Sequence, residues 1–132
     1  MYNLSKDEVF VLGNIGIMGV LLNKYELSYP MIEMLQTERP DNAAGFVAEA
    51  LYLNSLGEFG EAASLLEVSG SLEADINRDE ALALYIFSLF HSQQQERAYQ
   101  LARALLAEET VETEDPIRAL SEIIDLYEKE YT

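Results

Sequence analysis

Residues 50–62 read ALYLNSLGEFGEA. The small residue Ala50 is followed by apolar residues at helical spacing, and Gly57 then interrupts the pattern. Phe59 and a second small residue, Ala62, open the next helical pattern. Two helices joined by so short a turn pack antiparallel. The stretch therefore predicts a helical hairpin in which Ala50 and Ala62 let the two helices approach closely.

The rest of the chain carries helical periodicity too, and alternating strand patterns are weak. Asn42, Asn77 and Asp115 stand where capping side chains are expected at helix starts, and Pro116 suits a first helical position. The pattern predicts seven helices, at residues 6–22, 25–37, 42–55, 58–69, 78–92, 95–108 and 116–130.

The small residue of every second helix recurs at a nearly fixed interval. Ser28, Ala62 and Ala98 lie 34 and 36 residues apart, and a period near 34 with two helices per unit is typical of tetratricopeptide repeats. The chain resembles that family over nearly its whole length. The resemblance implies an all-α fold in a single domain, 1–132: a short right-handed α-solenoid of three helical hairpins, at about 9–40, 43–74 and 79–110, with a capping helix at 116–130.

The three units match the family pattern unequally, and the middle one matches best. The first supplies Gly16 at the small position, Tyr25 after the turn and Pro40 at the end. The third has Ile86 where a small residue is expected and Thr110 in place of the final proline. Because one hairpin cannot bury its own apolar face, about three hairpins and a cap are needed for stability.

The charge balance excludes several classes of function. The chain has 24 acidic and 8 basic residues, for a net charge of −16, so it would be repelled by nucleic-acid phosphates and by anionic membranes. No apolar run is long enough to span a membrane, and the run at 9–22 lacks the basic start and cleavage site of a signal peptide. We expect a cytoplasmic protein with no nucleic-acid or membrane partner.

No motif for catalysis is recognisable. Gly13, Gly16 and Gly19 are spaced for helix packing rather than for a nucleotide-binding loop. His91 is the only histidine and has no partner nucleophile, and no cysteine is present. The acidic residues at 108–115 lack the glycine-containing pattern of a calcium loop. We therefore expect no enzyme activity, no catalytic residue, no cofactor and no metal site.

A binding surface is the remaining candidate site. In tetratricopeptide proteins the first helix of each hairpin lines a concave groove. The family register implies a mostly apolar row without the basic residues that clamp acidic peptides. We expect it to bind an amphipathic helix carrying some Lys or Arg, and to promote self-association when no client is bound. In the alternative interpretation, neighbouring helices bury the row as core. The row consists of Phe10, Ile17, Val20, Val47, Leu51, Asn54, Phe87 and Phe90.

A narrower resemblance concerns length, the order of the helices and the turn at Gly57. In these features the chain is similar to the needle-subunit chaperones of type III secretion. Such chaperones wrap the C-terminal amphipathic helix of the needle subunit, often with a second small co-chaperone, and keep it monomeric in the cytoplasm until export. The resemblance implies the same function here. A generic tetratricopeptide adaptor in a bacterial assembly or regulatory complex is the second hypothesis, and an enzyme of unknown type is the third.

Overall fold

The structure is a computed structural model that describes residues 23–131. Six α-helices and one short 3₁₀-helix follow one another along this part of the chain, without a β-strand among them, which confirms the all-helical prediction. Each predicted helix within this range is present, and its ends lie within two residues of the prediction. The helix predicted at 6–22 lies outside the described residues. The elements are α2 (Tyr25–Glu38), α3 (Ala44–Ser55), α4 (Phe59–Val68), η1 (Ser71–Glu73), α5 (Arg78–His91), α6 (Gln95–Ala107) and α7 (Glu114–Tyr131).

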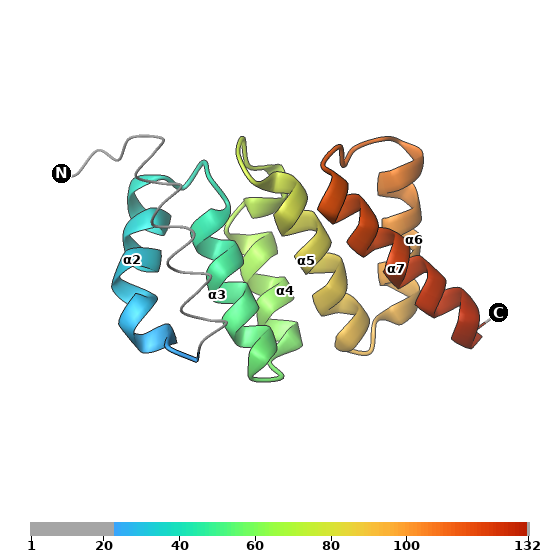
Figure 1. Ribbon diagram of the computed structural model, residues 1–132, viewed down its shortest axis with the longest axis horizontal. Coiled ribbons are helices and arrows are strands. Elements are labelled where there is room, and N and C mark those ends of the chain that lie inside the picture. The colour runs from blue at the N-terminus through green and yellow to red at the C-terminus, as the bar shows by residue number, and fades with distance from the viewer. Residues whose placement is uncertain (1–22, 132) are drawn as a thin grey trace.

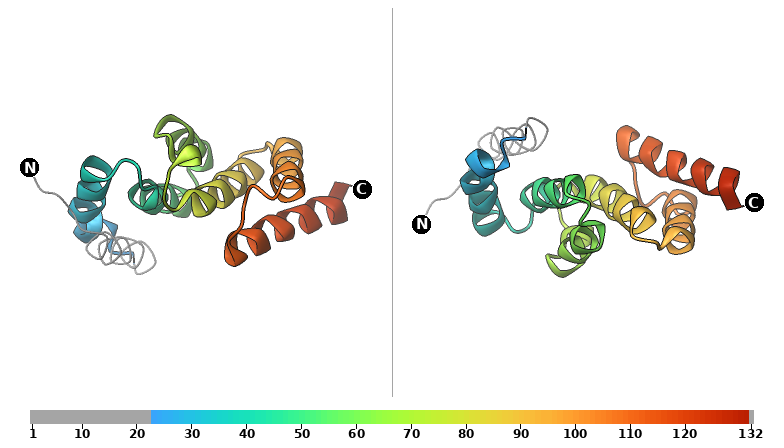
Figure 2. Two further views of the ribbon diagram at one scale, coloured as in Figure 1. Left: turned by 90° about the horizontal axis from the view of Figure 1, so that it is seen from above. Right: turned by 90° about the horizontal axis from the view of Figure 1, so that it is seen from below.

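The helices form an elongated row in which each packs on the next (Figure 1). Packing also skips one helix, because α3 contacts α5 and α5 contacts α7. Figure 2 shows that α4 and α7 lie on opposite sides of α5. As a result α5 is covered by four neighbours and is the most deeply buried helix.

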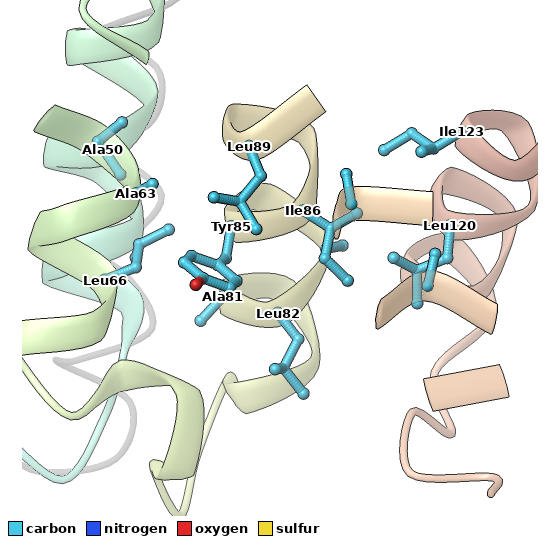
Figure 3. Close-up of a cluster of buried hydrophobic side chains, with 14 of the residues drawn as sticks. Ala50, Ala63, Leu66, Ala81, Leu82, Tyr85, Ile86, Leu89, Leu120 and Ile123 are labelled. Atoms are coloured by element: carbon cyan, nitrogen blue, oxygen red, sulfur yellow. The ribbon is translucent and has the colours of Figure 1, made fainter. Parts of the chain in front are cut away.

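The core is centred on α5 and combines small with large side chains (Figure 3). Tyr85 points toward Leu66 of α4, and Ile86 points toward Leu120 of α7. Ile86, which stands where the family pattern has a small residue, is buried here as a large core side chain. The alanines expected to allow close helix packing are fully buried, with exposed fractions of 0% at Ala50, Ala62 and Ala98.

Two of the three predicted helix caps are wrong. Asn42 Oδ1 does accept a hydrogen bond from Ala44 N at 2.9 Å, as a capping side chain should. Asn77 precedes α5 but makes no cap with its side chain, and its backbone is left-handed, with φ of 63°. Asp115 lies inside α7, which begins at Glu114, so Pro116 is the third helical residue. Proline is tolerated there because the N–H groups of the first turn have no partner within the helix.

Polar contacts hold the starts of successive hairpins together. Asn77 Nδ2 donates to Asn42 Oδ1 at 2.8 Å, and beside this bond Ala43 N donates to Ile76 O at 2.9 Å. One hairpin later, Asp79 Oδ2 accepts from Thr113 Oγ1 at 2.6 Å and from the backbone N–H of Thr113 at 3.0 Å. The starts of α3, α5 and α7 are thus joined through their loops as well as through the core.

Candidate functional site

The residues predicted to bind a client lie on neighbouring helices wherever the structure describes them. Val47 and Leu51 are on α3, Phe87 and Phe90 are on α5, and the two helices pack on each other. These four residues, two on each helix, make up the predicted α3–α5 surface. Three further predicted residues, Phe10, Ile17 and Val20, lie outside the described part of the chain.

The α3–α5 surface is neither fully exposed nor fully buried. Phe87 is the most accessible of the four, with 39% of its surface exposed. Val47, Leu51 and Phe90 are half-buried, and Val47 and Phe90 pack against the core. The same side chains therefore support the core and leave some apolar area facing solvent.

Asn54, the one polar residue predicted for the groove, is buried between the two helices. It is 8% exposed, and its Oδ1 lies 3.1 Å from Ser88 Oγ, which also donates to Leu84 O at 2.8 Å. A serine hydroxyl has one proton and cannot donate both bonds at once. If the Asn54 amide turned over, its Nδ2, which has no acceptor among the described residues, would donate to Ser88 Oγ. In either orientation Asn54 joins α3 to α5, and we remove it from the client-binding residues.

An aromatic cluster flanks Phe87. His91 lies 4.4 Å from Phe87, 5.3 Å from Phe59 and 5.5 Å from Phe90, measured between ring centroids. Phe59 comes from the start of α4, so the cluster joins two hairpins at the end of α5. The sequence analysis considered His91 only as a candidate for catalysis that lacks a partner nucleophile. Its position four residues after Phe87, on one helical face, was the signal that it belongs to an aromatic cluster.

A second aromatic contact occupies the equivalent place one hairpin earlier. Tyr25, which lies 34 residues before Phe59, stacks on Tyr52 of α3 with ring centroids 3.7 Å apart. Burial and nearby Glu49 raise the pKa of the Tyr25 hydroxyl, so it remains neutral. An aromatic residue after the hairpin turn thus contacts an aromatic residue of the following helix at both positions.

The arginines are already engaged by groups within the chain. Arg39 pairs with Asp41 at 3.2 Å, and Arg118 pairs with Glu114 at 3.1 Å. Arg97 bonds the Tyr85 hydroxyl, which in turn donates to Glu67. Burial, followed by the hydrogen bond to Glu67, raises the pKa of Tyr85 to about 12. These arginines therefore bind groups of their own chain, and the excess of acidic residues determines the charge that a partner meets.

A polar hollow of about 460 Å³ opens at the start of α5, between Asp75, Arg78, Asp79 and Thr113. Burial raises the pKa of the Asp79 carboxyl, but hydrogen bonds from the Thr113 hydroxyl and from the backbone N–H of Glu112 and Thr113 together lower it below its usual value. Asp79 is thus an ionised anchor for the loop before α7. Within residues 23–131 no group of three or more acidic or histidine side chains is arranged to hold a metal ion.

The helices of residues 23–131 include none that is long and apolar enough to span a bilayer. Comparison of the chain with models of protein families, with curated proteins and with solved structures finds no match. The observations that bear on function are therefore the contacts between hairpins, the α3–α5 surface and the distribution of charge.

Proposed function

We propose that the chain is a short tetratricopeptide-like solenoid that acts as a cytoplasmic chaperone. Its client is an amphipathic helix of a type III secretion subunit, with the needle subunit as the first candidate. The chaperone would cover the apolar face of this helix and prevent premature assembly of the subunit.

The spacing of contacts between hairpins supports a solenoid. Asn42 bonds Asn77 across 35 residues, Asn54 bonds Ser88 across 34, and Asp79 bonds Thr113 across 34. In a repeat protein each unit contacts its neighbours through equivalent positions, so contacts recur at the repeat period. The spacing of 34 and 36 residues between Ser28, Ala62 and Ala98 is the same period seen in the sequence.

The exposed ring of Phe87 is the observation that carries the proposal for a client. Phe87 is 39% exposed on α5, beside an α3 helix whose Val47 and Leu51 are half-buried. Partly exposed aromatic residues backed by a packed core are typical anchors of helix-in-groove recognition. An apolar helix face laid across α3 and α5 would bury this ring further.

The charge of the protein defines the kind of helix that fits. With a net charge of −16 and the arginines engaged internally, the surface repels acidic peptides and attracts clients that carry Lys or Arg. We therefore expect apolar contacts to supply most of the affinity, and the acidic residues to raise the association rate.

Co-expression with the needle subunit of the same host, with and without a small co-chaperone, tests the proposal. The tagged chain should retain the needle subunit, whereas Leu51→Glu and Phe87→Glu should lose it while keeping their helicity by circular dichroism. Val68→Glu is the matched control, because Val68 lies on α4 and is already 84% exposed. Retention of the subunit by both folded surface variants would contradict the proposed site, and failure of the parent chain to retain it would contradict the proposed client.

A further inference from the structure

Three aromatic rings meet where α5 ends and α4 begins. The ring centroid of Phe87 lies 6.4 Å from that of Phe59 and 4.4 Å from that of His91. The three ring planes are tilted against one another by between 31° and 63°, so no ring covers the face of another by parallel stacking. Phe87 and His91 are exposed, and Phe59 is half-buried. These three rings, the ring cluster, therefore leave aromatic surface open to solvent.

The aromatic contact one hairpin earlier is closed by comparison. Tyr25 and Tyr52 stack with their planes only 4° apart and their centroids 3.7 Å apart. Each of these two rings therefore covers one face of the other. The ring cluster is the more open of the two contacts, and it adjoins the α3–α5 surface because Phe87 belongs to both.

The helices that carry the ring cluster supply no positive charge near it. Arg78 is the only Lys or Arg in α3, α4 and α5. It lies at the start of α5, about 20 Å along the helix axis from His91, the last residue of that helix. Arg97, at the start of α6, bonds Tyr85 and Gln94. The end of α5 also carries the partial negative charge of the helix dipole. A cation brought by a partner would therefore be attracted to the ring cluster.

We propose that one Lys or Arg side chain of the client lies across the ring cluster. The inference rests on the proposed function and deepens it, because it places a basic residue of the client helix beside the ends of α3 and α5, which lie at the same edge of the molecule (Figure 1). A cation is attracted to the face of an aromatic ring by the negative charge above the ring plane. The apolar stem of Lys or Arg would cover the exposed ring of Phe87 at the same time.

Fluorescence anisotropy with the labelled C-terminal helix of the needle subunit of the same host tests this placement. His91→Lys puts a fixed positive charge into the ring cluster and should weaken binding of this peptide about tenfold. His91→Phe keeps an aromatic ring and should bind within about twofold of the parent chain. Gln100→Lys makes the same change of charge at an exposed site on α6 and should also stay within about twofold. Circular dichroism verifies that each variant keeps the helicity of the parent.

A second set of peptides, with each Lys or Arg replaced in turn by Gln, identifies the residue that lies on the rings. One of these peptides should bind the parent chain about three- to fivefold more weakly and lose nothing further with His91→Lys. If His91→Lys binds the unchanged peptide as tightly as Gln100→Lys, or weakens every peptide equally, the inference is overturned. The proposed function then stands, provided that Phe87→Glu still loses the peptide. A parent chain that does not bind the peptide would contradict both.

Discussion

Asn77 Nδ2 donates a hydrogen bond to Asn42 Oδ1 at 2.8 Å, although 35 residues separate the two asparagines. The same Asn42 oxygen accepts from Ala44 N at the start of α3. One side chain therefore caps a helix and binds the loop of the next hairpin. The side chain that marks the start of α3 therefore also holds two successive hairpins together.

Replacement of Asn42 by Ala should lower the free energy of unfolding by about 1–2 kcal/mol, because it removes the cap of α3 and leaves Asn77 without its acceptor. Asn42→Asp keeps an oxygen for both donors and should lose much less. Urea denaturation measures the free energy of unfolding of both variants and of the parent chain. Equal losses for the two variants would show that the oxygen of Asn42 is not what stabilises the hairpin starts.

Asp79→Asn should lower the free energy of unfolding by about 1–3 kcal/mol at pH 7, because the hydrogen bonds to Thr113 and Glu112 lose the carboxylate charge. The pKa of Asp79 is lowered in the folded state. Its ionised form therefore stabilises the fold above about pH 4, and this contribution disappears as the pH falls through the folded-state pKa. Urea denaturation of the parent chain and of Asp79→Asn measures this effect. The difference between their free energies of unfolding should become smaller as the pH falls. A difference independent of pH would show that the charge of Asp79 is irrelevant.

Gly57→Ala and Gly60→Ala should change stability in opposite directions. Gly57 has φ of +79°, with no atom within 4 Å of an added Cβ, so alanine there should cost about 1 kcal/mol through backbone strain alone. Gly60 lies in the first turn of α4 and is equally unobstructed, so alanine should stabilise by about 0.5 kcal/mol. Thermal denaturation of the two variants and of the parent chain gives the melting temperatures that test both expectations. A melting temperature for Gly57→Ala at or above that of the parent would contradict the strained turn.

Ala62→Leu should destabilise the fold by about 1–3 kcal/mol, because Ala62 is 0% exposed and the added atoms would force helices apart. Ala104→Leu, on the exposed side of α6, is the matched control and should change the melting temperature little. If Ala62→Leu were tolerated as well as Ala104→Leu, close packing of α4 through its alanine would be excluded.

The helices were predictable because their signals are local. Gly57 stops one helix, apolar spacing marks the buried side of each, and Asn42 caps α3 through a bond within two residues. The role of Asn77 was not predictable in this way. Its side chain could cap α5 or bind a loop far back in the sequence, and only the stacking of hairpins favours the second.

The candidate site was predictable only as a set of helical faces. Helical periodicity predicts that Val47 and Leu51 lie on α3 and that Phe87 lies on α5. It does not show which neighbouring helix covers each residue. Asn54 is buried because Ser88, 34 residues later, packs against it. Asp79 was missed as an anchor because its three donors come from the loop before α7.

The central claim is that the α3–α5 surface holds an amphipathic helix, and fluorescence anisotropy with a labelled C-terminal helix of the needle subunit tests it most directly. The parent chain and Val68→Glu should bind the peptide with the same affinity. Leu51→Glu and Phe87→Glu should bind at least about tenfold more weakly, as expected for central apolar anchors. If the peptide bound the two folded surface variants as tightly as the parent, the α3–α5 surface would not be the client site.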